Sequence, residues 1–165
     1  MYYFAYGSNM SSRRLRQRLG RVSPLAVAIL TRHRLCWHKQ GRDGSGKCDA
    51  APADDADDAV IGVLYELAAE DRPLLDRFEG VGAGYEAVDI RAMLLSGEFI
   101  EAFTYQATRI DKDAIPFCWY KSHVLHGARE HGLPADYIAG LESVVAQDDP
   151  DWERHRHELS IYASG

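Results

Sequence analysis

The spacing of apolar residues changes near residue 113, and this change limits the possible folds more than any other feature of the sequence. Before it, β-branched and aromatic residues gather in short runs that predict strands at 2–6, 24–37, 59–67, 85–95 and 98–107. After it, apolar residues recur every three or four positions, which predicts helices over about 117–128 and 134–147 and a last short helix from Pro150. Early strands followed by late helices favour an antiparallel α+β domain, a curled sheet or small barrel with helices outside.

Shorter patterns fill in the first half of the chain. Ser11 or Ser12 can cap a helix over 13–19, and 70–78 suits a short helix with Pro73 in its first turn. The two strands joined at Ser96-Gly97 predict a hairpin, whereas 24–37 is either one long strand or a broken pair. Residues 41–58 are expected to form a loop, which either borders a binding site or is a solvated tether.

Length and charge narrow the classes of protein. The 165 residues, 46% hydrophobic and 27% charged, fit an ordinary globule, and we expect a single domain over residues 1–165. A net charge of −6 argues against a nucleic-acid partner. One group of cations gathers on and just after the first predicted helix: Arg13, Arg14, Arg16, Arg18 and Arg21. These side chains either attract anionic substrates or form a solvated helix face, and the solvated face is the more common case.

Cysteine and histidine spacing favours neither a disulfide framework nor a metal site. The odd set Cys36, Cys48 and Cys118 lacks C-x-x-C spacing, and His33 and His38 would point to opposite faces of a strand. We therefore expect no metal and no cofactor. Nothing in the sequence resembles a signal peptide or a long apolar span, so the expected location is the cytoplasm, with no membrane partner.

Two motifs carry possible chemistry. The first strand runs into Gly7-Ser8-Asn9, whose backbone N–H groups and small side chains can hold an anion, although these residues also form ordinary turns. In Phe78-Glu79-Gly80-Val81, a single carboxylate follows an apolar helix and can exchange protons; an exposed Glu before a helix-ending Gly is the alternative.

Together with a third segment, these motifs resemble a known family. Tyr3-Phe-Ala-Tyr-Gly-Ser-Asn9, Phe78-Glu-Gly-Val81 and Gly127-Ala-Arg-Glu-His-Gly-Leu-Pro134 occur in the order found in the γ-glutamylcyclotransferase family, and the resemblance extends from Tyr2 to about Val145. It implies an α+β fold, a small mixed or mostly antiparallel β-barrel with flanking helices. It also implies a cofactor-free enzyme that converts γ-glutamyl amino acids into 5-oxoproline and a free amino acid.

The same resemblance implies roles for individual residues. Glu79 would be the acid/base, Tyr120 would reach the substrate, and the backbone of one segment would line the substrate site: Tyr3, Phe4, Ala5, Tyr6, Gly7 and Ser8. Glu86 departs from the family pattern, in which an aromatic or aliphatic residue is expected. Either Tyr85 itself occupies the pocket or Glu86 points out of it.

The residue chemistry is consistent with that reaction. Glu79 would take a proton from the substrate's α-ammonium and return it to the departing amine. The amides of Gly7 and Ser8 could bind the α-carboxylate or the oxyanion, with Asn9 and the hydroxyls of Tyr6 and Tyr120 as further donors.

Several alternatives stay open. The chain could instead be a non-catalytic module that binds a small anion or metabolite. The substrate could be glutathione or a γ-glutamyl-amine, and the acidic run Asp54, Asp55, Asp57 and Asp58 could weakly favour a cationic departing group. The expected partner is a small-molecule γ-glutamyl substrate. The protein could be a monomer or a homodimer.

Overall fold

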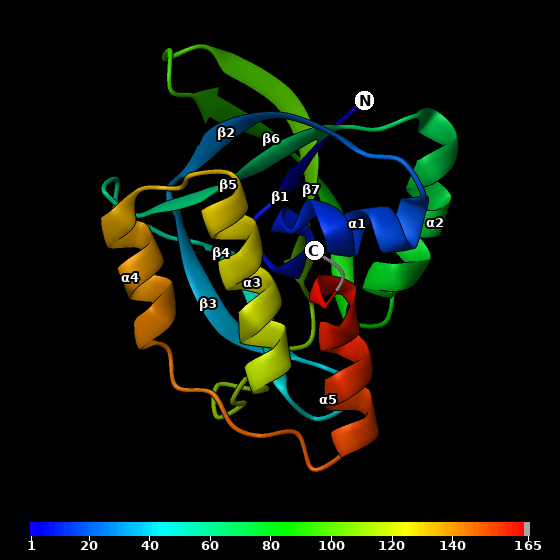
Figure 1. Ribbon diagram of the computed structural model, residues 1–165. Coiled ribbons are helices and arrows are strands. Elements are labelled where there is room, and N and C mark those ends of the chain that lie inside the picture. Colours follow the sequence, from blue (N-terminus) through cyan, green and yellow to red (C-terminus); the bar gives the residue numbers. More distant parts are fainter. Residues whose placement is uncertain (164–165) are drawn as a thin grey trace.

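Five strands close into a barrel in the computed structural model, which describes residues 1–163. Around the barrel the order is β1, β5, β2, β6, β7, and neighbours are antiparallel except β1 and β7, which run parallel (Figure 1). The strands span Tyr2–Ala5 (β1), Ser23–Thr31 (β2), Ala59–Glu66 (β5), Tyr85–Leu94 (β6) and Phe99–Ala107 (β7). The expected mixed, mostly antiparallel barrel is confirmed.

Strand β5 links the barrel to the helices around it. It pairs with both β1 and β2, and Val60, Val63 and Leu64 are fully buried. Tyr65 of the same strand directs its hydroxyl toward the first helical segment, where it donates to the Met10 carbonyl over 2.7 Å. Burial of such large apolar side chains stabilises the contact between the barrel and the turn at residues 8–11.

The segment at 41–58 corrects one expectation. Residues 46–52 form a strand, β4 (Gly46–Pro52), which pairs with β3 (His33–Gln40) in a separate two-stranded sheet. The polar composition obscured it, because buried Asp49 is an unusual strand residue. Its carboxylate accepts from His38 Nε2 over 2.9 Å and from the Ala107 N–H over 2.8 Å, which offsets the cost of burial.

The long run at 24–37 is a broken pair. Arg32 has a φ of 56°, a left-handed conformation that ends β2 and redirects the chain into β3. Strands β2 and β3 therefore belong to different sheets. This break sends β3 away from the barrel and toward the cavity described below.

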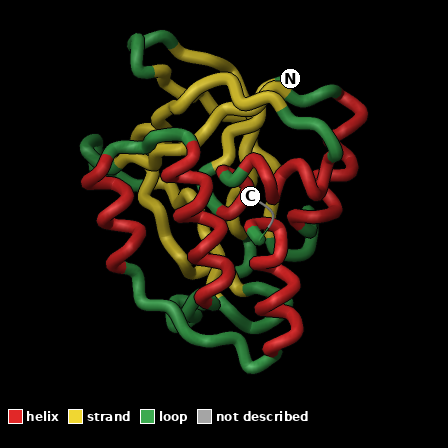
Figure 2. The backbone as a smooth tube through the Cα atoms, in the orientation of Figure 1, coloured by secondary structure: helices red, strands yellow, loops and turns green. Residues whose placement is uncertain are grey.

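The expected helices are all present. They gather on one side of the strands and at their edge (Figure 2). Their bounds are Ser12–Leu19 (α1), Arg72–Glu79 (α2), Cys118–Glu130 (α3), Ala135–Ser143 (α4) and Trp152–Leu159 (α5), with 3₁₀ turns at Ser8–Met10, Ala69–Asp71 and Ser160–Tyr162. Helix α1 is capped by Ser11, and α4 ends four residues before the expected boundary because Val144 is extended. None of the helices within residues 1–163 has the length and apolar character of a membrane span.

Gly127 lets helix α3 cross the turn at residues 8–11 at very short range. A methyl group at Gly127 would overlap the backbone of Met10 and Ser11. The third sequence motif thus begins at a packing position that supports the residues directly after the first motif.

Replacing Gly127 with alanine is therefore expected to destabilise the protein by about 1–3 kcal/mol, because the helix and the turn must separate. Thermal unfolding would show this as a Tm lower by several degrees, roughly 2–4 °C per kcal/mol. Gly140→Ala is the matched control, since Gly140 lies in α4 with open space around it and alanine favours a helix there. Equal Tm values for the two variants would contradict the close crossing.

Candidate active site

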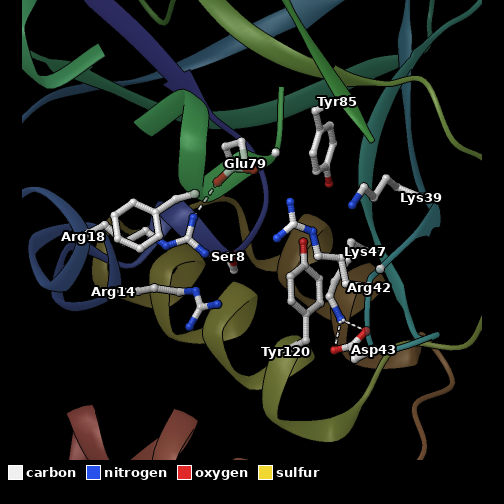
Figure 3. Close-up of a pocket in the computed structure, with 13 residues that line it drawn as sticks. Ser8, Arg14, Arg18, Lys39, Arg42, Asp43, Lys47, Glu79, Tyr85 and Tyr120 are labelled. Carbon is white, nitrogen blue, oxygen red and sulfur yellow. Dashed lines mark hydrogen bonds and ion pairs between the residues drawn. The ribbon is translucent and has the colours of Figure 1, made fainter. Parts of the chain in front are cut away.

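Two adjoining cavities lie where β1, α2, α3 and the β3–β4 hairpin meet, and Figure 3 shows the residues that line the larger one. The inner one, about 30 Å³, is lined mostly by tyrosines and the turn after β1, and the outer one, about 230 Å³, is lined mostly by charged side chains. Four residues belong to both walls: Ser8, Glu79, Tyr85 and Tyr120. A ligand that spans the two cavities would pass these four side chains.

Glu79 is the last residue of α2, and Gly80 in the left-handed region ends the helix directly after it. Its side chain is 14% exposed, and Oε1 accepts from Asn9 Nδ2 over 2.9 Å and from Arg18 Nη1 over 2.5 Å. Both bonds end on Oε1. The second oxygen, Oε2, is thus the one that can exchange a proton with a ligand.

Asn9 holds this arrangement together. Its Nδ2 also donates to the Tyr3 hydroxyl over 3.0 Å, and its Oδ1 accepts from Arg18 Nη1 over 3.0 Å. Because both amide hydrogens are already engaged, Asn9 orients Glu79 and Arg18 rather than offering a free donor.

Gly7 and Ser8 of the turn after β1 line the inner cavity. Its first internal hydrogen bond is donated by Met10 N–H to the Gly7 carbonyl, so the amides of Gly7 and Ser8 precede the bonded part of the turn. A methyl group at Gly7 would lie 3.1 Å from both Cys48 Cβ and Tyr120 Oη. Glycine at this position keeps the turn, β4 and α3 close together around the inner cavity.

Tyr85 and Tyr120 are held by the backbone of Cys48 on β4. Tyr85 donates to the Cys48 carbonyl over 2.5 Å, and the Cys48 N–H donates to Tyr120 Oη over 3.0 Å. Burial raises the pKa of both phenols well above the ordinary value, so they stay protonated and can donate. Burial also raises the pKa of the Cys48 thiol to about 12, which leaves it a poor nucleophile at neutral pH.

The structure brings most of the predicted site residues together. Lining one or both cavities are Tyr3, Tyr6, Gly7, Ser8, Asn9, Glu79, Tyr85 and Tyr120. Phe4 and Ala5 are fully buried and do not line either cavity; the Phe4 carbonyl accepts from Thr104 instead. Glu86 is exposed on β6, whereas the Tyr85 side chain occupies the pocket.

Comparison with known proteins gives a consistent answer. A model of the AIG2-like family matches residues 59–141, half of the chain. A human γ-glutamylcyclotransferase is 29% identical over 154 residues, and its bovine counterpart is 30% identical over 154 residues, covering 88% of this chain and 79% of the relative. The chain belongs to the γ-glutamylcyclotransferase family. A solved structure titled γ-glutamyl cyclotransferase superposes with a TM-score of 0.87 at 25% identity, covering 99% of this chain and 98% of that one. The expectation of an enzyme of this type is confirmed.

In this γ-glutamylcyclotransferase family member the outer cavity is rich in cations, and only those of α1 belong to the group of arginines singled out from the sequence. The solvated-face interpretation is wrong for Arg14 and Arg18, which turn inward and line the outer cavity, while Arg13 and Arg16 are exposed. Arg14 and Arg18 are four residues apart and directly precede Leu15 and Leu19. This spacing was the sequence signal that they share the inward side of the helix. The other cations come from the β3–β4 hairpin: Lys39, Arg42 and Lys47.

The acidic run before β5 has no part in either cavity. Asp54, Asp55 and Asp57 are exposed, and Asp58 pairs with Arg34 over 2.6 Å. The walls of the two cavities therefore give no support to the idea that this acidic run favours a cationic departing group.

Proposed function

We propose that this protein converts a γ-glutamyl amino acid or a related γ-glutamyl compound to 5-oxoproline and a free amine, with Glu79 as general acid/base and no cofactor. The observation that carries the proposal is the position of Glu79 where the two cavities meet, with Oε1 bound by Asn9 and Arg18. Membership of the γ-glutamylcyclotransferase family supports it.

The reaction needs a base because the substrate's α-amine is mostly an ammonium at neutral pH, with a pKa of roughly 8. Glu79 Oε2 accepts that proton, and the neutral amine attacks the γ-carbonyl carbon of the same molecule. A five-membered ring forms, and the bond to the departing amine breaks as Glu79 returns its proton to that nitrogen. The ring nitrogen loses its second proton, which the departing amine takes up, so the products are the neutral lactam of 5-oxoproline and an ammonium. Arg18 stabilises the negative charge of Glu79 before the transfer.

The remaining groups position the substrate. Ring closure is intramolecular, so holding the curled conformer lowers the barrier more than recruiting a nucleophile would. Gly7, Ser8 and Tyr120 line the inner cavity, and their backbone N–H groups and hydroxyl would stabilise the oxyanion that develops at the γ-carbonyl.

Incubation of the purified protein with γ-glutamyl-alanine is expected to release 5-oxoproline and alanine in equal amounts. Chromatography of the reaction mixture measures both products. A non-catalytic binding module would bind γ-glutamyl compounds or 5-oxoproline saturably without converting them. Binding without turnover across a panel of γ-glutamyl compounds would therefore overturn the proposed activity.

A further inference from the structure

The outer cavity concentrates positive charge in a protein of net charge −6. Its wall holds five cationic side chains and only two carboxylates, those of Asp43 and Glu79. A cleft lined mainly by one sign of charge attracts ligands of the opposite sign.

Three of the five cations have carboxylate partners. Arg18 pairs with Glu79 over 2.5 Å, and this pair belongs to the proposed proton-transfer machinery. The other two pairs are Arg14 with Glu158 (2.5 Å) and Lys47 with Asp43 (2.9 Å). These three cations are therefore largely neutralised by the protein itself.

Lys39 and Arg42 form no ion pair within residues 1–163, and both line the outer cavity. Lys39 is buried, 8% exposed, with Nζ 4.7 Å from the centre of the Tyr85 ring. Arg42, in the turn between β3 and β4, is exposed at the cavity mouth. Desolvation lowers the pKa of Lys39, as expected for a cation held away from water.

The two side chains converge on the bend that follows Glu79. A Cβ at Gly84 would lie 3.0 Å from Lys39 Nζ, and one at Gly80 would lie 3.5 Å from an Arg42 guanidinium nitrogen. In Figure 3 the Arg42 guanidinium points into the pocket toward Glu79, and Lys39 lies beside Tyr85. Both cations thus lie on the outer side of the proposed base, where the departing half of the substrate must be.

We propose that Lys39 and Arg42 form the subsite for the departing amine and select γ-glutamyl compounds whose departing amino acid carries a side-chain carboxylate, such as glutamate or aspartate. The inference rests on the proposed function. A departing acidic amino acid has two carboxylates, one for each unpaired cation. A neutral amino acid supplies one, and a lysine side chain would be repelled by the cavity wall.

The test compares γ-glutamyl-glutamate with γ-glutamyl-glutamine, which have nearly the same size and differ by one charge. The unmodified protein should show a kcat/KM for γ-glutamyl-glutamate higher by roughly 10-fold or more, the size expected for one charge-assisted hydrogen bond. Lys39→Gln and Arg42→Gln should each reduce that ratio, mainly through KM. Two control variants, Lys112→Gln and Arg91→Gln, each remove one positive charge from an exposed position outside the two cavities. They should leave the ratio of the two kcat/KM values unchanged.

Each outcome decides between distinct conclusions. Equal or faster turnover of γ-glutamyl-glutamine by the unmodified protein overturns the subsite while the proposed activity stands. A preference for γ-glutamyl-glutamate that survives both cavity substitutions also overturns it, because other groups would then provide the selection. Absence of 5-oxoproline from every γ-glutamyl compound overturns the proposed function and the subsite with it.

Discussion

Replacing Glu79 with glutamine is expected to lower kcat on a γ-glutamyl substrate by about 10² to 10⁴-fold, the usual contribution of general acid-base catalysis. Glutamine keeps an oxygen that can accept from Asn9 and Arg18, as Oε1 does now, but it cannot take up a proton at the second position. KM should change much less than kcat, because the lost interaction belongs to proton transfer rather than to binding. Steady-state assays of 5-oxoproline formation measure both constants.

Glu86→Gln is the matched control for this experiment. Glu86 lies on β6 beside Tyr85, but its side chain is exposed and lines neither cavity, so the same chemical change should leave kcat unaltered. Both variants should unfold cooperatively near the Tm of the unmodified protein. Full turnover by a folded Glu79→Gln variant would remove Glu79 from the mechanism.

Acidification from pH 7.5 to pH 5 is expected to remove about 2 kcal/mol of stability through one buried histidine, His123 of α3. Its ring lies 2.8 Å from Arg14 Nη1 and 2.8 Å from the Tyr162 hydroxyl, and Nε2 also lies 3.1 Å from Glu158. Burial lowers the pKa of His123 to about 4, and the adjacent Arg14 charge acts in the same direction.

The direction of this effect follows from which state binds the proton. The unfolded chain takes up a proton near pH 6.5, whereas folded His123 stays neutral down to about pH 4. Stability is complete above pH 6.5 and falls as pH decreases toward 4. Desolvation alone would raise the pKa of Glu158, but hydrogen bonds from His123 and Arg14 hold it at about 2. Protonation of Glu158 therefore lowers the stability of the protein only at a pH below this interval.

Thermal unfolding between pH 7.5 and 5 separates His123 from the other titrating groups. His123→Gln cannot be protonated and keeps groups that can bond to Arg14 and Tyr162, so its Tm should fall less over this interval, by about 4–8 °C. His126, which is stacked on Tyr162, is present in both proteins and serves as an internal control. Parallel Tm curves for the two proteins would show that His123 does not titrate as described.

The sequence was sufficient for the barrel and its helices because local patterns agree with the tertiary structure there. Val60, Val63 and Leu64 are buried strand residues, and Ser11 caps α1 as its position predicts. Strand β4 was missed because buried Asp49 is acceptable only beside His38 and the Ala107 amide, and these come from distant parts of the chain. Such compensation cannot be read from a local window.

The site was predictable to a similar extent. Glu79 and the turn at residues 7–9 follow from recognisable motifs, and the structure places them in contact through Asn9. The direction of Arg14 and Arg18 depended on the side of α1 that faces the cavity. Lys39 and Arg42 reach the cavity only because the chain turns at Arg32, a local conformation that propensity does not reveal.

Strand β1 leads into the turn at residues 7–9, which lines the inner cavity, yet its own partners are β5 at Ala59–Glu66 and β7 at Phe99–Ala107. During synthesis, residues 2–9 therefore emerge long before the strands that enclose them, and α3, which supports the turn through Gly127, emerges later still. Contacts of such long sequence separation form slowly. The inner cavity is thus expected to be among the last parts of the protein to become ordered. A nascent chain shorter than about 130 residues should lack this cavity even where its barrel strands are already complete.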